Sequence, residues 1–273
     1  VAVGLGLAVH AWAGKEQGAR PQSRAIQADS ARLPMIALSG ASFTKGTEDG
    51  PANERPPVSE YVGPFFMDLT EVTLASYKAC VDAGACTQPD TAGACNWGKP
   101  GREHHPINCV DLAQAQDYCR WAGKRLPSED EWEYAARGTD GRRFPWGNES
   151  PANQLCWSGS NHGRGVRRET CQVTAFSSDV SPFGISGMAG NVSEWTLSRY
   201  TESYGSKPTD ERRVRRGGTW KGDAPGDYRA TSRAPEQQTV RRDDLGFRCA
   251  QDRLSRLVRP PATIDIPREP LPL

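Results

Sequence analysis

Apolar residues recur at helical spacing early in the chain. Leu74 and Tyr77 lie three residues apart, on what would be one face of a helix. Thr73, or Thr70 before it, offers the side-chain oxygen that an N-cap needs, and Gly84 is the residue type that most often ends a helix. The pattern therefore predicts a helix between these threonines and Gly84.

Two further segments carry complete signals for a helix start. Asp111 is followed by Gln114 at the third helical position, and Ser128 is followed in the same way by Glu131. Both pairs match the capping box, in which each side chain bonds the other residue's backbone N–H. Apolar positions follow each box, and Gly123 ends the first of these two segments. Two more helices are predicted.

The second half of the chain has a different pattern. Short runs such as 214–216 and 246–249 lie between glycines and are typical of strands and turns. The chain has 28 glycines, 21 prolines and only 36% hydrophobic residues, which favours a loop-rich fold. Few helices and many short strands in mixed order predict the α+β class.

The two ends of the chain differ from the region between them. Residues 1–13 are apolar and close on Ala11-Trp12-Ala13, which indicates the end of a signal peptide or a membrane anchor of an exported protein; a buried N-terminal strand is the alternative. Residues 14–33 are polar and are interpreted as a linker. Residues 254–273 form a proline-rich tail, which leaves one domain over 34–253.

The charge balance argues against a nucleic-acid partner. The chain has 34 basic and 33 acidic residues, so no broad basic surface is expected. The pairs Arg215–Arg216 and Arg241–Arg242 alternate with acids and are interpreted as solvated faces. No CxxC or HExxH motif occurs, so a zinc site is not supported.

Several charged residues that could pass for catalytic groups are interpreted as structural. Glu131 and Glu133 lie at a predicted helix start, near Arg125 and Arg137, where they suit the helix dipole and ion pairs. Arg248, in the run Gly-Phe-Arg-Cys, is expected to be a buried fork for a carboxylate or for carbonyl groups.

Six blocks of sequence together resemble one known family, the formylglycine-generating enzymes or sulfatase-modifying factors. The blocks are MDLTEVT (67–73), AQDYCRWAGKRLPSEDEWEYAARG (115–138), FPWGN (144–148), MAGNVSEW (188–195), RVRRGG (213–218) and LGFRCA (245–250). The resemblance implies a loop-rich variant of the C-type lectin fold, which agrees with the α+β prediction. It also implies a possible activity, because the founding members oxidise a sulfatase cysteine to formylglycine with oxygen and with copper held by two thiolates.

The eight cysteines are all expected to form disulfides. The family resemblance implies the pair Cys119–Cys249, which would close most of the domain. Proximity in sequence suggests the other three, Cys80–Cys86, Cys95–Cys109 and Cys156–Cys171.

The segment 217–233, GGTWKGDAPGDYRATSR, lacks what the oxidising members need. Their two copper-binding cysteines follow an Arg-Gly-Gly-Ser motif, whereas this chain has Thr219 for the serine and no cysteine between Cys171 and Cys249. Copper is therefore unlikely, because Cu(I) prefers thiolates. The segment is expected to form a groove for a protein, peptide or envelope ligand, although Trp220 could equally pack in the core. The candidate contact residues are Thr219, Trp220, Tyr228, Arg229 and Arg233.

A calcium site is a separate expectation from the resemblance. The carbonyls of Gly190 and Val192 and the carboxylate of Glu194 would be ligands, but Gly187 lacks the side-chain oxygen that the family has there. The alternative is that Asn191 and Glu194 only cap a tight turn.

Three functional hypotheses follow from the sequence. The first is a non-oxidising, exported binding module of this family. The second is a formylglycine-generating oxidase that converts a sulfatase cysteine. The third is an extracytoplasmic accessory domain of a larger membrane protein.

Overall fold

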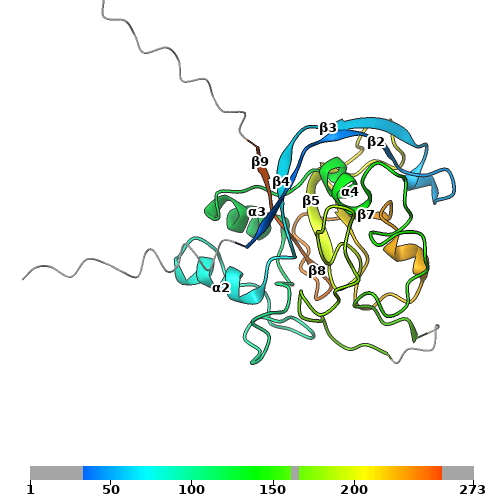
Figure 1. Cartoon of the computed structure of the whole chain (residues 1–273). Helices are drawn as coiled ribbons and strands as arrows, with labels where there is room; N and C mark the ends of the chain where they lie inside the picture. The colour runs from blue at the N-terminus through cyan, green and yellow to red at the C-terminus, as the bar shows by residue number, and fades with distance from the viewer. Residues whose placement is uncertain (1–32, 161–165, 254–273) are drawn as a thin grey trace, which may run out of the picture.

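The computed structural model describes residues 33–160 and 166–253 (Figure 1). The expectations for the apolar segment 1–13, the proline-rich tail and nearly all of the linker fall outside these residues. The described part is built from short strands, three α-helices and long connections, as the α+β prediction required. None of its helices is long and apolar enough to cross a membrane.

Strands from both ends of the domain meet in one sheet. Its order is β1 (Met35–Leu38), β4 (Phe65–Asp68) and β9 (Ala250–Asp252), with antiparallel pairing throughout. The first and last strands of the described chain therefore share β4 as a neighbour, which ties the two ends together.

Two other sheets complete the framework. β2 (Ala41–Lys45) and β3 (Val58–Val62) form an antiparallel hairpin. The larger sheet has the order β7-β6-β5-β8, in which only the β5–β8 pair is parallel. Its strands are β5 (Ser193–Arg199), β6 (Arg213–Arg216), β7 (Arg233–Glu236) and β8 (Leu245–Gly246). Of the two runs predicted as strands and turns, 214–216 lies within β6, whereas only Gly246 of 246–249 lies in a strand.

The three helices begin where the capping signals placed them. α2 (Leu74–Asp82) has Thr73 as its N-cap. α3 (Leu112–Trp121) and α4 (Glu129–Arg137) both carry a complete capping box, on Asp111 and Ser128 respectively. In α4 the buried face includes Trp132, and the helix contacts β2, β3, β5 and β6.

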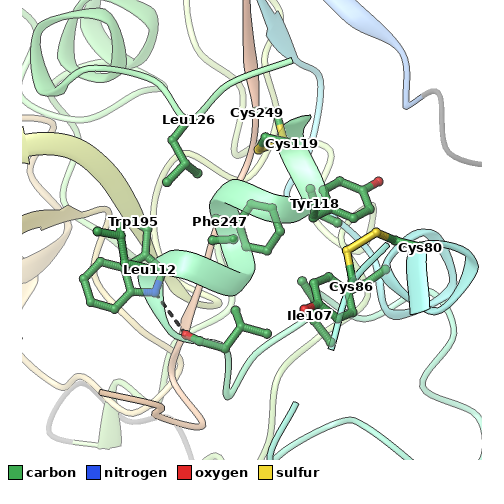
Figure 2. Packing of buried hydrophobic residues seen from close by; sticks show 14 of the residues in the cluster. Cys80, Cys86, Ile107, Leu112, Tyr118, Cys119, Leu126, Trp195, Phe247 and Cys249 are labelled. Atoms are coloured by element: carbon green, nitrogen blue, oxygen red, sulfur yellow. Dashed lines mark hydrogen bonds between the residues drawn. A yellow bond between two sulfur atoms is a disulfide. The ribbon is translucent and has the colours of Figure 1, made fainter. Parts of the chain in front are cut away.

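The main hydrophobic core lies between α2, α3 and the β5–β8 region (Figure 2). Tyr118 and Phe247 pack edge to face with ring centroids 5.5 Å apart, and the Trp195 indole donates a 3.0 Å hydrogen bond to the Val110 carbonyl. A buried indole is costly without such an acceptor, so this bond fixes the orientation of Trp195. The core holds α3 against the strands that carry the candidate site.

All eight cysteines are paired. The disulfides are Cys80–Cys86, Cys95–Cys109, Cys119–Cys249 and Cys156–Cys171, the same pairs that the sequence analysis expected. No free cysteine occurs, and every cysteine of the chain lies within the described residues. Cys119–Cys249 links residues 130 positions apart, so it constrains the unfolded chain more than the short-range pairs do.

Candidate binding cleft

The segment 217–233 borders a cleft with a volume of about 470 Å³. Two glycines, Gly217 and Gly218, take the chain from β6 into the cleft wall with positive φ angles of 101° and 69°. A side chain at Gly218 would meet the Tyr228 ring at 2.6 Å, so glycine is required there. The cleft is lined mainly by charged residues and glycines: Glu54, Arg215, Arg216, Gly217, Gly218, Thr219, Gly222, Gly226, Asp227, Arg229, Arg233, Arg242 and Asp244, among others.

A cluster of buried ion pairs forms the floor of this cleft. Arg216, which is fully buried, pairs with Glu133 through Nη2, and its other terminal guanidinium nitrogen, Nη1, donates to the backbone carbonyls of Thr231 and Ser232. Arg233 pairs with Glu129 at 2.6 Å. We call Glu129, Glu133 and the cations bound to them the floor cluster; its cations are Lys45, Arg137, Arg216 and Arg233.

The carboxylates of the floor cluster are well compensated. Glu133 accepts from the Gly46 N–H at 2.7 Å and from Arg137 at 3.0 Å, in addition to Arg216. Burial alone would raise the pKa of Glu129, but Arg216, Lys45 and Arg233 outweigh it and hold that pKa below its usual range. The expectation that Glu133 and Glu131 serve ion pairs is confirmed, since Glu131 binds Arg125 at 2.6 Å.

The rim of the cleft contains arginines with different degrees of pairing. Arg229 binds Glu54 at 2.7 Å, and Arg242 binds Asp244 through two bonds of 2.8 and 2.9 Å. Arg215 has only one contact with an acid, Glu236 at 3.4 Å, and it shares that acid with Arg242.

The closest ion-pair contact of Arg215 is therefore longer than that of the other cleft arginines in the described part of the chain. Its Nε atom makes that 3.4 Å contact but forms no hydrogen bond, as is also the case for Nε of Arg216. Burial and the neighbouring Arg242 both lower the pKa of Arg215. A guanidinium in this state favours the approach of an anionic group.

The structure brings only some of the predicted contact residues into the cleft. Thr219, Arg229 and Arg233 line it, but Trp220 and Tyr228 do not, so the aromatic part of the expected contact set lies outside this cleft. Tyr228 is fully buried, where its ring meets Trp157 edge to face and its hydroxyl donates to the Thr219 carbonyl at 2.8 Å. The Tyr228 hydroxyl already has an acceptor inside the protein, so it offers no hydrogen-bond donor to a ligand.

Trp220 takes the core position that the sequence left as an alternative. It packs in a small cluster with Cys156 and Cys171, and its indole N–H donates to the Asp243 carbonyl at 3.1 Å. The interpretation of Arg215–Arg216 as a solvated pair is also wrong, because β6 directs Arg216 into the interior. Successive side chains along a strand point to opposite faces of the sheet. Arg216 therefore points into the interior, whereas Arg215 lies on the other face and is only half-buried.

The turn that was expected to bind calcium is organised by an arginine. Both carboxylate oxygens of Glu194 accept from Arg248, at 2.8 to 3.0 Å, and one also accepts from the Trp132 indole at 2.8 Å. Both oxygens of Glu194 are thus already bound within the protein, and its expected role as a calcium ligand stays a prediction. The interpretation of Arg248 as a buried fork is confirmed, since it also donates to the Gly187 carbonyl at 2.8 Å. For the carbonyls of Gly190 and Val192 the calcium expectation stays a prediction.

Comparison with known proteins places the chain in a family. The family model described as "Sulfatase-modifying factor enzyme 1-like domain" matches residues 22–253. The chain is 32% identical to the formylglycine-generating enzyme of Mus musculus, over 81% of this chain and 75% of that protein. It therefore belongs to the sulfatase-modifying factor family.

Two other relatives bear on the site and the fold. A Bos taurus protein named "Inactive C-alpha-formylglycine-generating enzyme 2" is 30% identical, with coverage of 79% of this chain and 87% of that protein. The solved structure of PvdO from Pseudomonas aeruginosa aligns with a TM-score of 0.67 and 27% identity, covering 81% of this chain and 95% of that one. The family thus includes proteins named as active and as inactive, and the lectin-like fold is shared.

Proposed function

We propose that this chain is a non-oxidising member of its family and that it binds an anionic protein or peptide segment in the cleft beside Thr219. The observation that carries the proposal is the chemistry of the cleft wall, which is built of arginines, carboxylates and glycines and includes no sulfur. Cu(I) requires soft ligands, and all eight thiols of the chain are consumed in disulfides.

The relatives support a loss of catalysis without loss of fold. A protein named as inactive is 30% identical to this chain, which is close to the 32% of the mouse enzyme. Overall sequence identity therefore does not distinguish relatives named as enzymes from relatives named as inactive. The residues of the site have to make that distinction. The oxidase alternative would need thiolates from somewhere other than segment 217–233.

The ligand chemistry follows from Arg215. Its guanidinium lines the cleft, and its one ion-pair contact among the described residues is with Glu236 at 3.4 Å. It can therefore bind a ligand carboxylate without breaking a tight internal ion pair. A volume of about 470 Å³ falls in the range of pockets that bind small ligands or a few residues of a peptide. Four disulfides suit an oxidising compartment, which supports an extracytoplasmic location for this binding module.

The oxidase alternative is tested directly with copper. The purified chain is incubated with Cu(I), oxygen and a peptide containing Cys-x-Pro-x-Arg, and the peptide is analysed by mass spectrometry. We expect the cysteine to remain unchanged. A formylglycine product formed at a rate above a no-protein control would overturn the proposal.

The binding role is tested with an array of fluorescent peptides that carry aspartate or glutamate, each matched to its asparagine or glutamine counterpart. We expect the acidic members to bind better, and Arg215→Ala to weaken them about tenfold to a hundredfold, the value of a hydrogen bond to a charged group. Arg120→Ala is the matched control, because Arg120 is 71% exposed on α3 and lines no part of the cleft. Equal binding by both variants would contradict the role of Arg215.

A further inference from the structure

One disulfide, Cys156–Cys171, lies directly behind the segment that forms a wall of the cleft. Both cysteines are buried against Trp220, in a small cluster apart from the main core. Trp220 follows Thr219 in the chain, and Thr219 lines the cleft. The packing of this disulfide therefore determines how the residues at the edge of the cleft are supported.

Asn191 connects the disulfide to that wall through three backbone groups. Its side-chain oxygen accepts from the Cys171 N–H at 2.9 Å, and its own N–H donates to the Cys156 carbonyl at 2.7 Å. Its carbonyl accepts from the Trp220 N–H at 2.8 Å. Asn191 has a positive φ of 57°, a conformation that surrounding bonds have to maintain. Both cysteines and Trp220 thus depend on the position of one residue.

A guanidinium contacts one sulfur of this disulfide. Arg167 Nη1 lies 3.0 Å from Cys171 Sγ, and Arg167 Nε donates to the Trp157 carbonyl at 3.2 Å, which fixes the group in place. Across residues 33–160 and 166–253, no lysine or arginine makes such a contact with another cysteine sulfur. A guanidinium binds a thiolate more strongly than a disulfide sulfur, so Arg167 stabilises the reduced pair relative to the oxidised pair.

The position of Cys156–Cys171 in the chain also favours selective opening. Cys171 is 9% exposed and has the exposed Glu169 and Gln172 close to it in sequence, whereas Cys119 and Cys249 are completely buried. Cys156 and Cys171 are 15 positions apart, against 130 for Cys119–Cys249. A short loop constrains the unfolded chain less, so opening this pair costs the domain less stability.

We propose that Cys156–Cys171 is a redox-sensitive disulfide, and that its opening loosens the cleft wall at Thr219 and Trp220. The reductant is a dithiol. One thiolate of the dithiol attacks a sulfur of the pair, which forms a mixed disulfide and releases the other cysteine as a thiolate. The second thiol of the dithiol then displaces the remaining cysteine. Two electrons pass to the chain and the dithiol becomes a disulfide. Its two protons go to the cysteines or, where Cys171 stays a thiolate beside Arg167, one goes to solvent.

The first test identifies the pair that opens. The whole chain is equilibrated at neutral pH with graded ratios of reduced to oxidised dithiothreitol, thiols are trapped with N-ethylmaleimide, and peptides are mapped by mass spectrometry. We expect Cys156–Cys171 to open before the other three pairs. Arg167→Ala should lower the equilibrium constant for this opening about tenfold, or about 30 mV, because the thiolate loses a charged hydrogen-bond donor. Arg168→Ala, at the exposed neighbouring position, is the matched control and should leave the constant unchanged.

The second test follows the cleft wall by hydrogen exchange, with Cys156–Cys171 alone opened and trapped. We expect faster exchange in the peptide that contains Thr219 and Trp220, because the Trp220 N–H loses a fixed acceptor in Asn191. The peptide that covers α3 should exchange as before. No ligand is needed, so the outcome does not depend on the proposed binding role.

Three results would overturn the proposal. Earlier opening of another pair, or an unchanged constant in Arg167→Ala, would mean that Arg167 does not make this disulfide redox-sensitive. Unchanged exchange at Thr219 and Trp220 after opening would mean that the disulfide does not support the cleft wall. If Arg167→Ala fails to fold, the order of opening in the unmodified chain decides.

Discussion

The floor cluster and a small cavity lined by Glu71 and Asp179, which we call the acidic cavity, both bury carboxylates, but the charge balance of the two regions is opposite. In the floor cluster the carboxylates of Glu129 and Glu133 meet four cations, and none of their oxygens is left without a partner. In the acidic cavity Glu71 and Asp179 each keep one buried oxygen unpartnered. Burial is therefore a poor guide to function, whereas the pairing of the buried groups is informative.

This difference in pairing distinguishes the floor cluster, whose carboxylates stabilise the fold, from the acidic cavity, whose carboxylates are only partly paired. A buried carboxylate loses its hydration, and only close cations and donors offset that cost. Arg216, Lys45 and Arg233 offset it for Glu129, so the carboxylates of this cluster are compensated within the protein. In the acidic cavity two carboxylate oxygens lack such compensation among the described residues.

The largest predicted effect comes from removing a cation of the floor cluster. Arg216→Met leaves Glu133 with one fewer partner and Glu129 with less compensation, and we expect it to lower the free energy of unfolding by about 3 to 5 kcal/mol. Urea unfolding followed by circular dichroism measures this. Arg120→Met, at an exposed position of α3, should stay within about 0.5 kcal/mol of the unmodified chain.

A double variant shows whether the loss is due to an uncompensated charge. Adding Glu133→Gln to Arg216→Met should recover part of the stability, because the stranded carboxylate is then neutral. If the two losses simply add, the ion pair is not the source of the effect, and the contrast between the two clusters loses its basis.

The next largest effect comes from removing a carboxylate, which should raise the free energy of unfolding in the acidic cavity and lower it in the floor cluster. Asp179→Asn removes a carboxyl whose one opposing cation, Arg248, is already bound to Glu194, so we expect a gain of about 1 to 2 kcal/mol. Glu133→Gln, the matched change in the floor cluster, should cost stability. Urea unfolding of both variants checks the two signs, and a loss for Asp179→Asn would contradict the comparison.

The features that the sequence predicted well depend on neighbours in the chain. The capping boxes at Asp111 and Ser128 satisfy the first N–H groups of their own helices, so three or four residues contain the whole signal. The family blocks also allowed one long-range contact to be predicted, because the disulfide Cys119–Cys249 joins two of these blocks. The lectin-like fold followed from the same blocks.

The site was harder to predict because its contacts join distant segments. Nothing near Tyr228 indicates that Gly218 and Gly222 leave space for its ring, and the hydrogen bond to Thr219 that keeps it inside spans nine positions. Glu71 and Asp179 line the same small cavity although they are far apart in the sequence, and no local sequence pattern predicts that they come together.

The smallest predicted effect concerns acid. The pKa of Glu129 is lower in the folded chain than in the unfolded one, so its contribution to stability is fully present above about pH 4.5 and is lost as the pH falls through the folded value. Glu129→Gln should therefore be less stable than the unmodified chain at pH 6, and the gap between the two should narrow as the pH falls below about 4.5. Urea unfolding at intervals of pH gives both curves. A gap that stays constant down to pH 3 would mean that the charge of Glu129 contributes nothing to stability, and that Arg233 is held by its carbonyl acceptors Asn53 and Thr201.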